Sequence, residues 1–172
     1  MEKIIPKPAY YWYAVYTKSR AEKKAQSELK EQNIEVFLPL QRKLRQWSDR
    51  KKWVDMPLIP GYLFVRISRR EYDKVLQSSY VVTYVRFEGT AAIIPDEQIE
   101  YLKMMLKQDT HEVSVTSEQL QPGKKIEVIA GPMIGMKAVL VKIQGKNKVA
   151  IQIEQIGFAA LVEIPVNDIR LI

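Results

Sequence analysis

The sequence predicts an α+β domain, an antiparallel sheet flanked by helices, followed by a small SH3-like β-barrel. In residues 1–107, β-favouring runs and segments with helical periodicity follow one another as strand, helix, strand, strand, helix, strand, helix. In residues 120–172, five short β-type runs are separated by turn residues and show no helical period. The polar segment between them, residues 108–119, is predicted to be a flexible linker.

The first strand, helix and second strand are predicted from the beginning of the chain. The aromatic run YYWYAVY, residues 10–16, favours a buried strand. Ser19 and Glu22 have the spacing of an S-x-x-E capping box, and an apolar residue every four positions predicts a helix that ends near Asn33. The run IEVFLPL is predicted to be the second strand, and its proline stops it.

Four further elements complete the predicted first domain. The run GYLFVRI, residues 61–67, favours a third strand, and a second capping box, Ser68 with Glu71, opens a short helix. The run VVTYVRF, residues 81–87, favours a fourth strand. Pro95 and the two acidic residues after it are typical of a helix start and predict the last helix of the domain.

The net charge of +7 comes from the predicted first domain and not from the barrel. Residues 1–107 contain 20 Lys and Arg against 13 Asp and Glu, whereas residues 108–172 contain 7 of each. A basic half predicts a partner that is a polyanion, and a neutral half predicts a function that charge does not drive.

The residue types present exclude several classes of function. The chain has no cysteine, which excludes thiol catalysis and the usual zinc sites. Its one histidine, His111, lies in the predicted linker without a partner, and Ser48 with Asp49 lacks a histidine base, so nucleophilic catalysis of the familiar kind is not expected. We therefore expect no enzyme activity, no metal and no cofactor. Because no apolar stretch has the length of a membrane span, we expect a cytoplasmic protein without membrane contact. We also expect the protein to be a monomer.

The segment QRKLRQWSDRKKW, residues 41–53, combines positive charge with aromatic side chains. It carries six Lys and Arg against one Asp, with two tryptophans among them. Basic side chains neutralise phosphates and aromatic rings stack on bases, which predicts nucleic-acid contact. The alternative is a solvated hairpin whose tryptophans pack onto the sheet. The nucleic-acid residues predicted here are Arg45, Arg50, Lys51 and Lys52.

A second basic set, Lys18, Arg20 and Lys24, lies between the first strand and its helix. A helix N-terminus attracts anions, which favours nucleic-acid contact, and the alternative is a solvated helix face. Large apolar residues are also more numerous than one sheet face needs, so some of them are predicted to form an exposed patch for a protein partner, while others belong to the core.

The runs WYAVYTKSRAEKKA, PLIPGYLFVRI and VVTYVRFEGTAAIIPDEQI resemble, in order and spacing, the N-terminal (NGN) domain of the NusG family of transcription elongation factors. The segment GKKIEVIAGPMIGMKAVLVKI is similar to the KOW domain of that family. The long basic insertion with WSDRKK before PLIPGY resembles the specialised RfaH and UpxY-type antiterminators, the latter from capsule operons.

This resemblance implies a factor that binds RNA polymerase on the clamp helices of its largest subunit and suppresses pausing and termination. It implies that Lys18, Arg20 and Lys24 face the upstream non-template DNA strand or the nascent RNA. The implied polymerase-binding residues are Tyr16, Ile59, Tyr62 and Phe64 on an apolar face toward the clamp helices, with Tyr84 and Ile93 nearby.

The turn GPMIGM in the barrel half is predicted to dock a protein. Apolar side chains beside a tight turn, in a half without net charge, favour protein docking over phosphate binding. The resemblance implies NusE or Rho as the partner of the KOW domain. The predicted docking residues are Pro132, Met133, Ile134 and Met136.

Two other functions remain open from the sequence. One is an RNA-binding or ribosome-associated KOW protein, which the neutral charge of the barrel half disfavours because phosphate binding needs a positive surface. The other is a general NusG elongation factor that recruits Rho, which the basic insertion disfavours.

Overall fold

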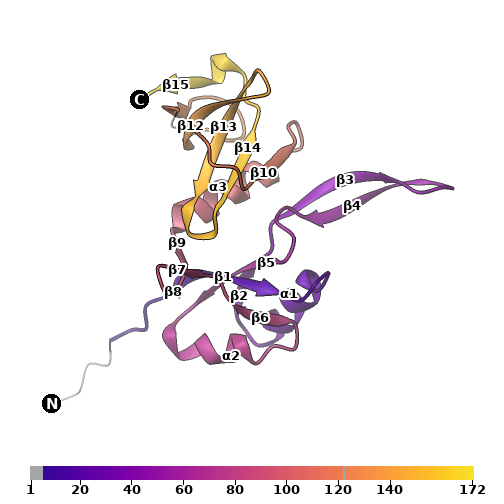
Figure 1. The fold of residues 1–172 in the computed structure, drawn as a ribbon, viewed down its shortest axis with the longest axis vertical. Helices are drawn as coiled ribbons and strands as arrows, with labels where there is room; N and C mark the ends of the chain where they lie inside the picture. The colour runs from indigo at the N-terminus through magenta and orange to yellow at the C-terminus, as the bar shows by residue number, and fades with distance from the viewer. Residues whose placement is uncertain (1–5, 122) are drawn as a thin grey trace. The chain divides into compact units, whose positions relative to one another are not determined.

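The structure is a computed structural model that describes residues 6–121 and 123–172 (Figure 1). Contacts between residues divide the chain into two compact units. Unit 1 comprises the residues up to Leu38 together with Pro60–Pro95, and unit 2 comprises Pro39–Ile59 together with Asp96–Ile172. The predicted α+β fold class with a sheet-rich C-terminal part is confirmed. The grouping by contacts differs from the predicted boundaries at 107 and 120.

The centre of unit 1 is a five-stranded antiparallel sheet. The strands lie in the order β2 (Glu35–Phe37), β5 (Tyr62–Ile67), β1 (Tyr11–Thr17) and β6 (Val81–Tyr84), and β9 (Ile93–Ile94) also pairs with β1. The first three predicted strands are therefore confirmed. β-Branched and aromatic residues fill these strands because their side chains pack well on a pleated surface.

The predicted fourth strand, residues 81–87, is divided into two. After β6 the chain forms β7 (Arg86–Phe87), which pairs with β8 (Thr90–Ala91) in a separate hairpin. The two loop residues, Glu88 and Gly89, have φ angles of 52° and 82°. Positive φ at both positions is the conformation of a tight hairpin turn, which pairs β7 with β8.

Two helices of unit 1 test the predicted capping boxes. α1 (Glu22–Glu31) contacts β2 and β5, and α2 (Tyr72–Leu76), which follows the short 3-10 helix η1 (Arg69–Glu71), contacts β6. At η1 the predicted box is present, because the Ser68 N–H donates to the Glu71 carboxylate at 2.8 Å. At α1 the predicted box is wrong: Ala21 is the N-cap residue and no side chain caps the helix.

Unit 2 contains a six-stranded antiparallel sheet that includes all five strands predicted for the barrel. Its order is β10 (Val113–Thr116), β14 (Phe158–Val162), β13 (Lys146–Ile153), β12 (Lys137–Ile143), β11 (Lys124–Val128) and β15 (Ile169–Leu171). The short 3-10 helices η2 (Glu154–Ile156) and η3 (Val166–Asp168) join its last strands. β10 lies in the predicted linker, where its backbone pairs with β14 and buries Val113.

Two more elements belong to unit 2. The helix α3 (Asp96–Lys107) buries Ile99, Leu102 and Met105 and contacts β13, where the Gln98 side-chain amide donates to the Gln152 carbonyl at 3.1 Å. The segment between β2 and β5 forms a two-stranded ribbon of β3 (Leu40–Gln46) and β4 (Lys51–Pro57) (Figure 1). No helix among the described residues is long and apolar enough to cross a membrane.

Candidate functional site

A partly exposed aromatic pair, Tyr16 and Tyr62, lies at the end of two neighbouring strands of unit 1. The two residues are in register between β1 and β5, and their ring centroids are 5.0 Å apart. Tyr16 is 37% exposed and Tyr62 is half-buried. Burial, together with a hydrogen bond to the Tyr16 side chain, raises the pKa of Tyr62 to about 12. The tyrosine pair therefore offers an aromatic surface with polar edges, as protein interfaces often do.

Glu22 positions the loop that leads into Tyr62. Glu22 is 7% exposed. Its carboxylate accepts the Gly61 N–H at 2.8 Å, while the Gly61 carbonyl accepts the Thr17 N–H at 2.9 Å. Gly61 has a φ of 81°, a conformation that glycine adopts at little cost. Sequence reasoning assigned Glu22 to a helix cap. Its actual partner is 39 residues away in the chain, so local spacing could not identify the contact.

The predicted clamp-helix residues do not form one surface. Residues paired across an antiparallel sheet project from the same face, and successive residues of a strand project from opposite faces. Tyr84 and Ile93 pair with Val15 and Tyr13, whereas the tyrosine pair includes Tyr16. Tyr84 and Ile93 therefore lie on the face opposite the tyrosine pair, which corrects the prediction that they lie near it.

Three of the predicted clamp-helix residues are buried. Ile59, Phe64 and Tyr84 are 2%, 0% and 2% exposed. The Phe64 ring stacks on Phe37 with centroids 6.0 Å apart. Tyr84 stacks on Tyr72 at 4.1 Å and donates its hydroxyl to the Tyr72 carbonyl at 2.8 Å. In this structure all three side chains belong to the interior and are not surface contacts.

Ile93 is 46% exposed and borders a cavity of about 570 Å³ in unit 1. Arg69 and Arg86 line this cavity together with the rings of Tyr13 and Tyr72. Burial raises the pKa of the Tyr13 phenol above its usual value. The two arginines lie in separate elements of the chain, and nothing in their sequence spacing indicated that the fold brings them together.

The basic set after β1 is on the surface, as predicted. Lys18, Arg20 and Lys24 are all exposed. The Ala21 N–H donates to the Lys18 carbonyl at 3.1 Å in the turn before α1, and Arg20 has a φ of 56°, which is uncommon for a residue with a side chain. Sequence reasoning missed Tyr80. The Lys24 ammonium lies 5.9 Å from its ring centroid, which extends the basic surface by an aromatic ring.

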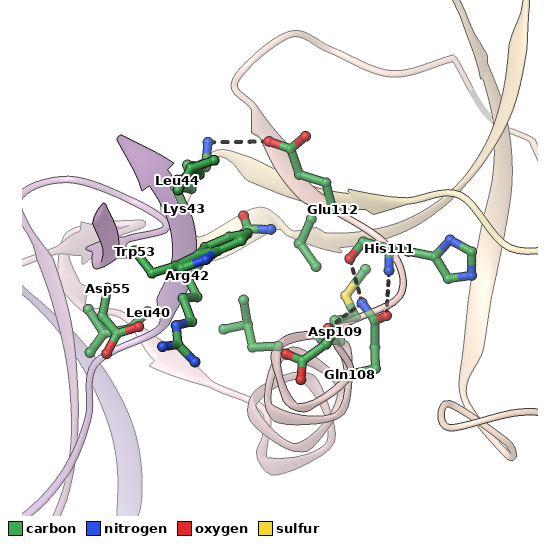
Figure 2. A pocket seen from close by; sticks show the side chains of 14 residues that line it. Leu40, Arg42, Lys43, Leu44, Trp53, Asp55, Gln108, Asp109, His111 and Glu112 are labelled. Carbon is green, nitrogen blue, oxygen red and sulfur yellow. Dashed lines mark hydrogen bonds and ion pairs between the residues drawn. The ribbon is translucent and has the colours of Figure 1, made fainter. Parts of the chain in front are cut away.

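The alternative that the hairpin tryptophans pack onto a sheet is wrong. Trp47 and Trp53 are 54% and 56% exposed, and the Arg42 guanidinium lies 5.9 Å from the Trp53 ring centroid. Trp53 lines a cavity of about 820 Å³ between the base of the ribbon and the segment after α3 (Figure 2). There the Lys43 ammonium lies 3.4 Å from the Glu112 carboxylate.

The predicted docking turn of the barrel divides into core and surface residues. Met133 and Met136 are 2% and 0% exposed, so they pack inside unit 2 and do not form a docking surface. The backbone closes the turn, because the Val128 N–H donates to the Met136 carbonyl at 2.9 Å. Pro132 is exposed and Ile134 is 60% exposed, so these two remain available to a partner.

The part of the chain that the structure describes contains no cluster of metal-binding side chains. Within residues 6–121 and 123–172, no three His, Asp or Glu side chains are grouped so that they could hold a metal ion. The one histidine of the sequence, His111, lies in the predicted linker and donates its backbone N–H to the buried Gln108 side chain at 2.8 Å (Figure 2).

Two sequence comparisons identify the family, and a solved structure shows a similar fold. Residues 10–103 match the family model described as transcription termination factor nusG. The transcription elongation factor Spt5 of Acidianus ambivalens is 32% identical over 116 residues, which cover 66% of this chain and 68% of that protein. A solved structure described as "Domain interaction in Thermotoga maritima NusG" covers 95% of this chain and 98% of that chain, with a TM-score of 0.50 and 22% identity.

The sheet domain of unit 1 and these sequence matches define the class of protein as a transcription elongation factor. The chain belongs to the NusG family, within which the Spt5 proteins are its relatives. Proteins of this family are transcription factors and not enzymes.

The raised pKa of Tyr62 predicts a loss of stability at high pH. A tyrosine of the unfolded chain titrates near pH 10, so the folded protein holds the phenol proton of Tyr62 more tightly than the unfolded chain does. This difference stabilises the folded protein, and the stabilisation is fully present below pH 10. We expect this contribution to disappear as the pH rises from 10 to 12. Urea unfolding at pH 9 and pH 11 measures the loss. A loss of the same size in Tyr62→Phe would contradict the assignment.

Proposed function

We propose that this NusG-family protein binds the clamp helices of RNA polymerase and suppresses pausing and termination, in a capsule or exopolysaccharide operon. The observation that carries the proposal is the partly exposed tyrosine pair beside the basic set of Lys18, Arg20 and Lys24. An aromatic surface gives affinity for a protein that is independent of DNA sequence, and the basic set adds attraction for the phosphates of the non-template DNA or nascent RNA.

The specialised role is supported by the ribbon of β3 and β4. Its exposed Trp47 and its basic side chains Arg45, Arg50, Lys51 and Lys52 give this chain a second nucleic-acid surface. In the proposal, residues 1–107 carry the polymerase contact and residues 120–172 dock a second factor, NusE or Rho. The exposed Pro132 and Ile134 are the docking residues of the barrel.

Replacing Tyr16 and Tyr62 together by alanine should weaken polymerase binding at least about tenfold. Buried aromatic anchors dominate protein interfaces, and each contributes about 2 kcal/mol or more when it is a hot spot. Binding is measured by the retention of labelled RNA polymerase on the immobilised full chain. The matched control is Ile93→Ala, which removes an exposed apolar side chain from the opposite face of the sheet. Equal binding by wild type and the double variant would refute the clamp-helix assignment.

The effect on transcription separates the specialised role from that of a general elongation factor. On a template with a pause site and a terminator, the wild-type protein should raise the fraction of full-length RNA, and the tyrosine double variant should not. A general factor that recruits Rho would instead increase Rho-dependent termination on the same template. Templates from a capsule operon and from an unrelated operon, compared in the same assay, test the choice of operon.

A further inference from the structure

The ribbon of β3 and β4 presents two different faces. In its register Arg45 lies opposite Lys52, and the Trp47 N–H donates to the Arg50 carbonyl at 2.7 Å to close the turn. Side chains alternate between the faces of a strand. Arg45 and Lys52 therefore share one face of the ribbon, and Trp47 and Arg50, which lie just beyond the strand ends and are joined by that hydrogen bond, continue the same alternation into the turn. This set of four residues is called the tip face below.

The charges of the tip face are unbalanced. Arg45 and Lys52 are direct neighbours across the two strands, and like charges in that position destabilise a hairpin. The ribbon segment has two acidic residues: Asp55 pairs with Arg42 on the opposite face, and Asp49 lies in the tip turn beside Arg50, where it leaves an excess of positive charge. Among the ion pairs of the described residues, none involves Arg45, Arg50 or Lys52. A bound polyanion would offset this repulsion.

Trp47 is placed differently from Trp53, although the two are equally exposed. Trp53 lies beside Arg42 and lines the cavity at the base of the ribbon (Figure 2). Trp47 is 54% exposed at the tip, and no ring or cation–π contact among the described residues includes it. A large apolar ring that contributes to no core is free to stack on a flat partner.

We propose that the tip face binds a single-stranded polynucleotide, with its phosphates on Arg45, Arg50 and Lys52 and a base stacked on Trp47. Cations and an exposed ring side by side are the combination that single-strand-binding proteins use. A duplex covers the faces of its bases by stacking them on each other, so Trp47 reaches a base face only in a single strand. The proposal deepens the nucleic-acid contact of the proposed function, on which it rests, and names the strand state that the ribbon binds.

Fluorescence anisotropy of the full chain with labelled oligonucleotides tests the proposal without polymerase. The probes are single-stranded DNA, single-stranded RNA and duplex DNA of the same sequence. We expect both single strands, or one of them, to bind more tightly than the duplex, and the comparison of DNA with RNA identifies the strand. Trp47→Ala should weaken binding roughly tenfold and leave its salt dependence unchanged, because stacking carries no charge.

Two further variants separate stacking from charge. Arg45→Gln with Lys52→Gln removes two phosphate contacts and should make the slope of log K against log salt concentration less steep by about 1.4. Trp53→Ala is the matched control, because it removes the same side chain from the other face at similar exposure, and it should change affinity less than twofold. Circular dichroism of each variant checks that the fold is retained.

Three results would overturn the proposal. The first is tighter binding of the duplex than of the single strands, which a ribbon inserted into the major groove would give. The second is an equal loss of oligonucleotide affinity in Trp47→Ala and Trp53→Ala, and the third is no loss of affinity in Trp47→Ala. The tyrosine double variant distinguishes this failure from failure of the proposed function. It should lose polymerase and keep the oligonucleotide, whereas Trp47→Ala should lose the oligonucleotide and keep binary binding to polymerase.

Discussion

Phe64→Ala is expected to lower the free energy of unfolding by about 3–5 kcal/mol. The Phe64 ring is fully buried in β5, where it stacks on Phe37 and lies opposite the equally buried Ala14. Ala14 is too small to fill the space that the ring leaves, so a cavity remains. Urea unfolding followed by circular dichroism measures the change. Phe64→Leu is the control, because an apolar side chain of similar volume should cost less than about 1.5 kcal/mol.

The same variants decide whether Phe64 contacts the polymerase, as the sequence predicted. If the ring is interior, polymerase binding by Phe64→Leu should equal that of the wild type, since Tyr16 and Tyr62 keep their places. A variant Phe64→Leu that unfolds like the wild type but binds polymerase at least tenfold more weakly would show that the ring itself makes the contact. That result would contradict the burial described here.

The strands were predictable because their signal is local. The runs YYWYAVY, residues 10–16, and KVAIQIE, residues 148–154, are rich in β-branched and aromatic residues. β1 overlaps the first run and β13 overlaps the second. The helix α1 was also predictable, and Asn33 after it has the positive φ of 60° that its predicted place at the helix end requires. Each of these inferences depends on residues close together in the chain.

Which residues form the candidate site was harder to predict, because the answer depends on pairing between distant strands. Tyr16 and Tyr62 were correctly placed together, but Tyr84 and Ile93 lie on the other face. A shift of one residue in register moves a side chain to the opposite face, and the sequence of one strand does not contain the register. The hydrogen bond from the Gly61 N–H to the Glu22 carboxylate likewise joins residues that are distant in the chain, so local sequence does not reveal it.

The polar segment 108–119 shows a different limit of sequence reasoning. Its composition is typical of a linker, yet β10 joins the edge of the sheet of unit 2 there. Backbone hydrogen bonds to β14 need no particular side chains, so an edge strand of four residues leaves little trace in composition. The buried Gln108, whose side chain bonds to Met105 and His111, orders the start of this segment.

Met136→Ala is expected to lower the free energy of unfolding of the barrel by about 2–5 kcal/mol, although the sequence placed Met136 in a docking surface. The side chain is fully buried, and its carbonyl accepts the Val128 N–H across the turn. Ile134→Ala, two residues away, removes a side chain that is 60% exposed and should change the free energy by no more than about 0.5 kcal/mol. Urea unfolding of the two full-length variants measures both changes.

The binding of a partner to the same two variants tests the division of the turn. If Ile134 forms the docking surface with Pro132, Ile134→Ala should weaken capture of purified NusE or Rho while stability is unchanged. Met136→Leu, which keeps an apolar side chain of similar volume, should retain both stability and capture. Loss of capture in Met136→Leu without loss of stability would return Met136 to the docking surface, because a buried side chain can affect a partner only through the fold that it supports.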